Sequence, residues 1–268
     1  AEDESGRELE RVLVGGGVTP IRVRRGDAPT IEKLRVVAAQ QQIVRVDREE
    51  LTDLDAAGAK QVLDALERAL EADTGSTVIV ISDYAKGLLG HDLVAAIMSV
   101  AKLREVAVVV DPKSSDILKY RGATIVKPNF SEAAEMAGIP SEVPDEAAID
   151  EIAQRLLVDG IGALAVSLSA VGVEVIERST RTRIPTRARL VSDVSGAGDS
   201  MIAGIAVGLA SGLSVLQSVQ VGNMAAGIAC ERPGTSVVTG VDLLNEMLVE
   251  ASPEGRPGTI ENWDELAR

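Results

Sequence analysis

Short apolar segments alternate with helix-like segments through the middle of this chain, and no other feature constrains the fold as strongly. The apolar runs cover residues 77–81, 106–110, 123–126 and 163–167. Hydrophobic residues make up 46% of the 268 residues but aromatic residues only 1%, so Val, Ile, Leu and Ala must build the core. Aliphatic strands that alternate with helices are typical of a parallel sheet covered on both faces. We therefore predict an α/β fold with a doubly wound, mostly parallel sheet and flanking helices.

The region before this alternation is expected to form a small β lid. A helix is expected over residues 5–14, followed by three short strands of alternating polarity at residues 21–24, 31–36 and 43–47. The lid strands, within residues 21–48, either cover a site and offer cations to it or only expose a charged face to water. Further helices are expected at residues 54–70, 92–103, 131–137, 145–158, 199–210 and 214–231, and a further strand at 172–177.

The domain organisation follows from composition. Residues 1–248 are expected to form one domain. Residues 249–268 contain two prolines and two glycines in a short stretch, which indicates a linker or tail that could begin a further domain.

The charge and the rare residue types exclude several function classes. The net charge of −14 disfavours binding to nucleic acid or to anionic membranes. Cys230 and His91 are the single cysteine and histidine, which excludes a disulfide framework, a Ser-His-Asp triad and a multi-histidine zinc site. Because no signal peptide and no apolar run of membrane length occur, a soluble cytoplasmic protein is expected.

One glycine-rich stretch carries the strongest chemical signal. Gly196-Ala197-Gly198-Asp199 precedes a run of small apolar residues that reads as a helix. Exposed N–H groups and the dipole at such a helix start favour an anion, phosphate above all. Asp199 is unusual beside a phosphate unless it removes the proton from an attacking hydroxyl. The alternative is an ordinary glycine-rich turn in which Asp199 caps the helix.

Polar clusters follow three of the predicted strands. They are residues 83–86, 111–113 and 127–129, the last two containing Lys113 and Asn129. Because ligands of open α/β folds bind at the carboxyl ends of parallel strands, we expect the chemistry at this edge of the sheet.

Several motifs together resemble one family. DVSGAGDS, which begins at Asp193, resembles the second signature of the ribokinase-like (PfkB) carbohydrate kinases, and KPNFSEAAEMAG resembles their Asn-x-x-Glu segment. SDYAKG, VVVDPK, YRGATIVKPN, TIEKLRV and QQQIVRVD are similar to the heptose-7-phosphate kinase half of bifunctional ADP-heptose synthases. The resemblance runs from about residue 1 to about residue 245 and implies a ribokinase-like fold. The first part of the family's domain, with much of its sugar pocket, is expected to be missing.

The resemblance implies a role for each matching residue. Asp199 would be the catalytic base, and the N–H groups of Gly196, Ala197 and Gly198 would form an anion hole. Asn129 and Glu132 would organise Mg²⁺ and the nucleotide phosphates, with Glu132 holding the metal through water. The remaining nucleotide-binding residues would be Ser167, Gly172, Ser195, Gly198 and Asn223. The substrate-binding residues would be Lys33, Arg35, Lys86, Lys113 and Asp193.

The implied activity is phosphoryl transfer from ATP, with Mg²⁺, to D-glycero-D-manno-heptose 7-phosphate. The product would be the 1,7-bisphosphate, a precursor of ADP-heptose and of the lipopolysaccharide core. Two alternatives stay open: a catalytically impaired kinase-like module that binds nucleotide or dimerises, and a kinase for another sugar or nucleoside. The expected partners are small molecules and, through the lid strands, a second copy of the chain, with neither nucleic acid nor membrane among them.

Overall fold

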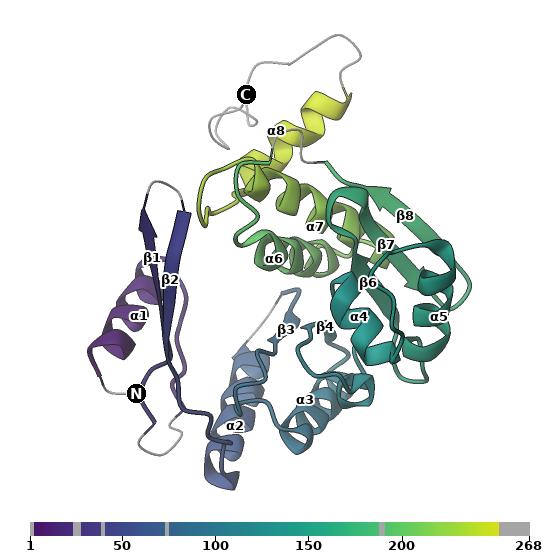
Figure 1. Ribbon diagram of the computed structural model, residues 1–268. Coiled ribbons are helices and arrows are strands. Elements are labelled where there is room, and N and C mark those ends of the chain that lie inside the picture. The colour runs from purple at the N-terminus through teal and green to yellow at the C-terminus, as the bar shows by residue number, and fades with distance from the viewer. Residues whose placement is uncertain (1–2, 24–27, 39–40, 73–74, 188–190, 252–268) are drawn as a thin grey trace, which may run out of the picture. The chain divides into compact units, whose positions relative to one another are not determined.

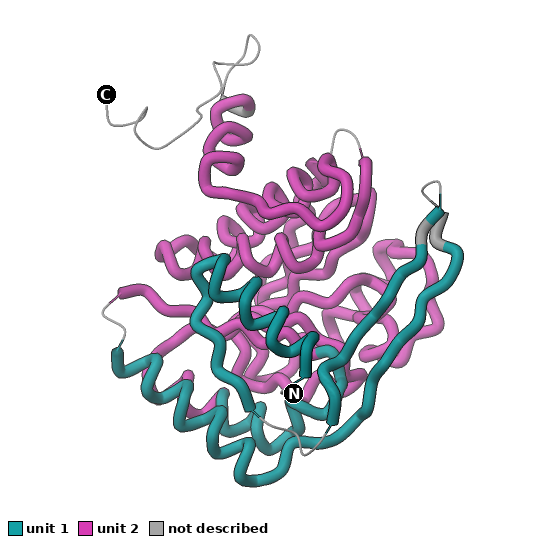
Figure 2. The backbone as a smooth tube through the Cα atoms, turned by 90° about the vertical axis from the view of Figure 1, so that its left-hand side faces the viewer, with its two compact units in different colours: residues 1–73, 84–97 teal, residues 74–83, 98–268 magenta. Residues whose placement is uncertain are grey.

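A six-stranded sheet forms the centre of the larger of two compact units. The computed structural model describes residues 3–23, 28–38, 41–72, 75–187 and 191–251. One unit holds residues 1–73 and 84–97, and the other holds residues 74–83 and 98–268 (Figure 2).

The sheet of the larger unit is mixed and mostly parallel. Strands β3 to β6 run parallel to one another, whereas β7 is antiparallel to β6 and β8 is antiparallel to β7. The order in the sheet equals the order in the chain: β3 (Val78–Ser82), β4 (Ala107–Asp111), β5 (Ile125–Val126), β6 (Ala163–Ser167), β7 (Gly172–Glu177) and β8 (Arg181–Pro185). The predicted α/β class and the predicted mostly parallel sheet are confirmed.

Helices connect and cover these strands (Figure 1). They are η1 (Ile117–Tyr120), α4 (Phe130–Ala137), α5 (Glu146–Leu156), η2 (Ser169–Val171), α6 (Ala197–Ala210), α7 (Val215–Cys230) and α8 (Gly240–Ala251). Helix α3 (His91–Leu103) begins in the smaller unit and ends in the larger one. Among the described helices, none is both long enough and apolar enough to span a membrane.

The core of the larger unit is aliphatic, as the composition requires. Val109, Ile125 and Ala165 point from the sheet toward α6, where they join buried Met201 and Ile205 in one cluster. Side chains on a strand alternate between its two faces, so the neighbouring buried residues Val108, Val110, Leu164 and Val166 point the other way. Helix α4 packs against β6 and against α5, and these two helices cover that second face (Figure 1).

Helices α6 and α7 approach each other at backbone distance. A Cβ atom added to Gly204 would lie 2.8 Å from the Cα of Gly222, and one added to Gly208 would lie 2.7 Å from the Cα of Ser218. Real Cβ atoms do not come this close to another backbone. Glycine at Gly204 and Gly208 therefore allows α6 to lie directly on α7.

The free edge of the sheet at β8 carries charge. Glu174 on β7 is buried, and its carboxylate lies 3.2 Å from Arg181 Nε and 2.6 Å from Arg183 Nε on β8. Both arginines also pair with Glu146 at the start of α5. The ion pairs therefore tie the edge strand to the helix that covers it.

The smaller unit contains a helix pair and a two-stranded ribbon. Its elements are α1 (Glu4–Gly15), β1 (Glu32–Ala38), β2 (Gln41–Arg48) and α2 (Ala56–Ala72). The ribbon is antiparallel, with Leu34 opposite Val46 and Val36 opposite Val44. Lys33 and Arg35 lie on its other, charged face.

The structure corrects two expectations about elements. Residues 21–23 form no strand, because this short alternating run has no pairing partner in the described part of the chain; Arg24 lies outside it. Helix α8 was not predicted, and residues 249–251 of the predicted tail belong to it. The rest of that tail, residues 252–268, lies outside the described residues.

The close contact of α6 and α7 makes a stability prediction. Gly204→Ala should lower the free energy of unfolding by about 1–3 kcal/mol, because the added methyl group forces two helix backbones apart. Equilibrium urea unfolding followed by circular dichroism measures this change. Gly15→Ala is the matched control: its Cβ would meet nothing within 4 Å, and we expect a change within about 0.5 kcal/mol. Equal effects of the two substitutions would contradict the packing argument.

Candidate active site

The start of α6 presents open backbone donors. Gly196 precedes the helix with a φ of 78°, a left-handed conformation that favours glycine, and no side chain caps this end. The N–H of Ala197 donates to the carbonyl of Val194 over 3.2 Å, so the donor role expected of Ala197 is not available in this arrangement. Within the described residues, the N–H groups of Gly198 and Asp199 have no acceptor. The first turn of α6 therefore offers an anion site, although not with every donor that was expected.

Asp199 lies in the first turn of α6 and is exposed. Its carboxylate has no hydrogen-bond or ion-pair partner within the part of the chain that the structure describes. A negative charge in the first turn interacts favourably with the positive end of the helix dipole. An unpartnered carboxylate beside an anion site is able to accept a proton from a hydroxyl group that comes near.

Lys127 places a buried positive charge next to the same helix start. It follows β5, its side chain is only 5% exposed, and its Nζ lies 2.9 Å from Oδ1 of Asp111 at the end of β4. A Cβ added to Gly198 would lie 3.7 Å from this Nζ. The ammonium group and the open N–H of Gly198 thus face the same space, which favours an anion there.

A second buried network fixes the loop that follows β4. Asp83, at the end of β3, is 3% exposed and accepts hydrogen bonds from Lys119 Nζ (2.6 Å) and from the Tyr120 hydroxyl (2.8 Å). The same hydroxyl accepts a bond from the backbone N–H of Ser114. Burial, together with the bond to Asp83, raises the pKa of Tyr120, so this hydroxyl stays protonated. The network therefore holds the segment that carries Lys113.

The Asn-x-x-Glu residues form a capping box at α4. The Asn129 side chain accepts a bond from the N–H of Glu132, and the Glu132 carboxylate accepts one from the N–H of Asn129, each at 2.9 Å. The second oxygen of Glu132 pairs with Lys113. No group of three potential metal ligands occurs among the described residues, so a cation here would have Glu132 as its single carboxylate and would keep much of its water.

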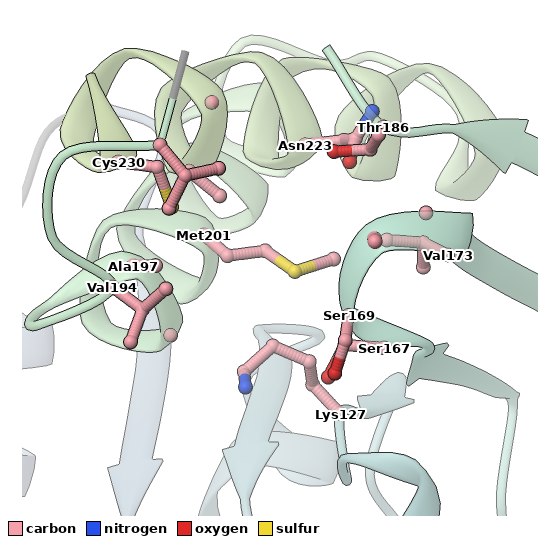
Figure 3. A pocket seen from close by; sticks show the side chains of 16 residues that line it. Lys127, Ser167, Ser169, Val173, Thr186, Val194, Ala197, Met201, Asn223 and Cys230 are labelled. Carbon is pink, nitrogen blue, oxygen red and sulfur yellow. The ribbon is translucent and has the colours of Figure 1, made fainter. Parts of the chain in front are cut away.

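An apolar cavity of about 480 Å³ lies beside the helix start (Figure 3). Met201 points into it above Lys127 (Figure 3). Of the residues expected to bind nucleotide, Ser167, Gly172, Gly198 and Asn223 line this cavity. The other lining residues are Lys127, Ser169, Ala170, Val173, Thr186, Val191, Val194, Ala197, Met201, Ala226, Gly227 and Cys230.

Asn223 fixes one wall of the cavity. Its side chain is 5% exposed, and its Nδ2 donates to the carbonyl of Pro185 over 2.9 Å. This bond joins α7 to the end of β8. Because this bond uses one N–H of the amide, the second N–H and the carbonyl oxygen of the side chain are left for a ligand.

Asp193 and Ser195, both expected to contact ligands, shape the loop before α6. Asp193 accepts bonds from the N–H of Ser195 (2.9 Å) and from the N–H of Gly234 (3.1 Å). Hydrogen bonds from the Ser195 backbone and hydroxyl lower the pKa of the Asp193 carboxyl. Asp193 therefore holds the loop through backbone contacts, and neither residue lines the cavity.

Three predicted substrate-binding residues lie in the smaller unit. Lys33 and Arg35 project from β1, and Lys86 follows β3. Lys33 and Lys86 both contact Glu49, at 3.5 Å and 2.8 Å. The structure thus brings these two lysines together, while Arg35 lies opposite Arg45 in the ribbon.

Sequence reasoning missed several residues of the site. Lys127 belongs to the polar cluster at residues 127–129, which follows a predicted strand. Its place in the site could therefore be predicted from the sequence. Met201, Thr186 and Cys230 line the cavity but carry no sequence signal, because only the packing of α6 on α7, and of α7 against β7 and β8, brings them to it.

Comparison with known proteins places this site in a family. The model of the pfkB family of carbohydrate kinases matches residues 2–239. The bifunctional protein HldE of Trichlorobacter lovleyi is 39% identical over 253 residues, which are 93% of this chain and 50% of that protein. The chain therefore spans about half the length of the curated relatives it matches.

Solved structures share the fold at low sequence identity. Phosphofructokinase-2 of Escherichia coli in complex with potassium has a TM-score of 0.73 at 20% identity, covering 90% of this chain and 77% of that one. Ribokinase of Giardia lamblia has a TM-score of 0.73 at 19% identity, covering 94% and 81%. These likenesses confirm the ribokinase-like fold. With the family match over most of its length, the chain belongs to the pfkB family of carbohydrate kinases.

Proposed function

We propose that this kinase transfers the γ-phosphoryl group of ATP to the 1-hydroxyl of D-glycero-D-manno-heptose 7-phosphate. The products are ADP and the 1,7-bisphosphate. The observation that carries the proposal is the unpartnered carboxylate of Asp199, which lies beside open backbone donors and the buried ammonium of Lys127. A base, an anion site and a cation within one small region are what phosphoryl transfer to an alcohol requires.

Asp199 acts on the acceptor. Its carboxylate takes the proton of the sugar hydroxyl as the hydroxyl oxygen attacks the γ-phosphorus. The bond between the γ-phosphorus and the bridging oxygen breaks, and the electron pair leaves with ADP. The protonated carboxyl then loses its proton to water, which its exposure permits.

Backbone donors and Lys127 act on the transferred group. Negative charge lies on the phosphoryl oxygens throughout the transfer, and the N–H groups at the start of α6 stabilise it. Lys127 is nearly buried, so water screens its charge little, and it favours an anion more strongly than an exposed lysine would. The ion pair with Asp111 holds this ammonium group in place before ATP binds.

Mg²⁺ fits the donor set around Asn129 and Glu132. Glu132 is partly exposed and offers carboxylate oxygens, and Asn129 adds an amide oxygen. Bound there, Mg²⁺ would neutralise charge on the nucleotide phosphates. Lys113 now pairs with one oxygen of Glu132, so a cation bound there would take the place of this ammonium group.

The apolar cavity suits the nucleoside part of ATP. Its volume of about 480 Å³ falls in the usual range for small-molecule sites, roughly 300–1,000 Å³. Its lining is mostly apolar, and Asn223, Ser167 and Thr186 add polar groups that can orient a base or a ribose. Gly198 at the start of α6 lines the cavity, so a nucleotide within it can direct its phosphates toward this helix start.

The identity of the sugar rests on sequence likeness. The segments at 30–36, 82–87 and 108–113 resemble heptose-7-phosphate kinases, and the relative at 39% identity is named bifunctional protein HldE. Lys33, Lys86 and Lys113 supply positive charge that a phosphorylated sugar needs in so acidic a chain. The product is then a precursor for ADP-heptose and lipopolysaccharide synthesis.

The catalytic role of Asp199 can be tested directly. Asp199→Asn should lower kcat by about 10²- to 10⁴-fold, because the amide cannot accept the hydroxyl proton. Release of ADP from Mg²⁺-ATP and the heptose 7-phosphate measures the rate. Asp64→Asn, on the exposed face of α2, is the matched control and should retain the wild-type rate.

The alternatives give different outcomes in the same experiment. Thermal stabilisation by ATP without turnover by the unaltered chain would overturn the kinase proposal in favour of a nucleotide-binding module. A clear preference for fructose 6-phosphate, ribose or adenosine as acceptor would overturn the heptose assignment. Equal rates for Asp199→Asn and the wild type would remove Asp199 from the mechanism.

The nucleotide cavity can be tested by filling it. Ala226→Leu adds three carbon atoms at a lining position of α7 and should raise the KM for ATP about tenfold or more, while the KM for the sugar changes little. Ala203→Leu, at an exposed position of α6, is the control. An unchanged KM for ATP would show that the nucleoside binds elsewhere.

We also propose that two copies of the chain associate through the β1–β2 ribbon. Four aliphatic side chains are exposed on one of its faces: Leu34 (62%), Val36 (43%), Val44 (46%) and Val46 (54%). A contiguous exposed apolar face favours a protein contact. Related kinases do associate, as the tetrameric inhibited form of E. coli phosphofructokinase-2 does.

A charge on this face should separate the copies. Val44→Asp places a carboxylate in the apolar contact, and sedimentation equilibrium should then give the monomer mass. Val143→Asp, at a position that is 64% exposed in a loop, should leave the assembly unchanged. A monomeric wild-type chain would contradict the proposal.

A further inference from the structure

Two lysines from distant parts of the smaller unit meet at one carboxylate. Lys86 Nζ lies 2.8 Å from one oxygen of Glu49, and Lys33 Nζ lies 3.5 Å from the other. Lys33 and Lys86 are 53 positions apart in the chain, so the contact arises from the fold rather than from local sequence. Each oxygen of Glu49 therefore receives one ammonium group.

The backbone around this contact is fixed. Lys33 lies on β1 directly opposite Asp47 of β2, and Glu49 follows β2 immediately. The N–H of Leu54 donates to the carbonyl of Gly87 over 3.0 Å, which ties the segment after Glu49 to the loop that carries Lys86. The three side chains meet because the ribbon and this loop are held together.

Further charged groups join this cluster. Lys33 also lies 3.1 Å from Asp47, and Asp47 receives Arg45 at 2.9 Å. The hydrogen bond from Lys86, aided by the charge of Lys33, lowers the pKa of Glu49, so this carboxylate stays ionised at neutral pH.

The exposed fractions show that a ligand can reach the cluster. The side chains of Lys33, Lys86 and Glu49 are 36%, 29% and 25% exposed. A group in water can therefore approach both lysines. The carboxylate of Glu49 carries one negative charge and bridges the two lysines. A phosphate group could bind both lysines at this position.

We propose that the carboxylate of Glu49 holds Lys33 and Lys86 until the phosphate group of the sugar displaces it and takes both lysines. This inference rests on the proposed function, because it names the residues that recognise the phosphate already present on the substrate. A phosphomonoester carries close to two negative charges at neutral pH, so it attracts the lysines more strongly than Glu49 does. The same charge repels Glu49 and moves it aside. A sugar without a phosphate lacks the charge for this exchange, so Glu49 makes the site selective.

Removing the charge of Glu49 tests the exchange. Glu49→Gln should lower the KM for the sugar phosphate about two- to fivefold, the size of a partly exposed ion pair, and leave the KM for ATP unchanged. Lys86→Met should raise the KM for the sugar phosphate. In the double variant the benefit of Glu49→Gln should shrink, because one of the released lysines is gone. Glu50→Gln is the control, an adjacent exposed carboxylate without an ion pair in the described residues.

A binding measurement keeps the test independent of turnover. Calorimetric titration with inorganic phosphate should give a tighter Kd for Glu49→Gln than for the wild type and Glu50→Gln, by the same factor. This result without any sugar phosphorylation would overturn the proposed function and leave the exchange standing. A KM for the sugar phosphate and a Kd for phosphate that are unchanged or higher in Glu49→Gln would overturn the exchange, whatever the activity.

Discussion

The candidate site depends on the contact between α6 and α7, two helices whose backbones touch. Gly204 lies against Gly222, and Gly208 against Ser218, with no side chain between them. This contact lets α6 lie between α7 and the strands β3 and β4, so that its first turn reaches Lys127 at the end of β5. This chain has almost no aromatic residues. Small residues, which let the helices pack closely, therefore fill the core in place of large side chains. The geometry of the anion site therefore follows from core packing.

The parts of the fold that could be predicted are those whose pattern is local. The strands at β3, β4 and β6 are continuous aliphatic runs, and the helices between them carry their own start signals, such as Asp145 before α5. The run at 21–24 has a strand-like pattern too, yet it forms no strand over its described residues. Whether a short alternating run becomes a strand depends on a partner elsewhere in the chain, which the run itself does not contain. The mixed ending of the sheet at β7 and β8 depends on pairing in the same way.

The candidate site also contains residues that a local sequence pattern indicates and residues that only the fold brings together. Gly196 and Asp199 could be identified because a helix start with glycines has a meaning that local sequence carries. The contact between Asp193 and Gly234 joins residues 41 positions apart, and nothing in either segment indicates it. Through this contact Asp193 holds the loop, and its expected contact with substrate stays a prediction. Lys127 lies between these two cases. The sequence marks the polar end of its strand, but its burial against Asp111 depends on the pairing of β4 with β5.

The charged edge at β8 has a consequence for how the chain behaves in concentrated solution. An outer strand with free N–H and C=O groups can recruit a strand from another molecule and so begin aggregation. To pair there, a second strand would have to lie close to Arg181 and Arg183, which are held by Glu174 and Glu146. Charge held at an edge disfavours such growth, especially against a partner that carries the same arginines. This arrangement therefore protects the β8 edge of the folded sheet.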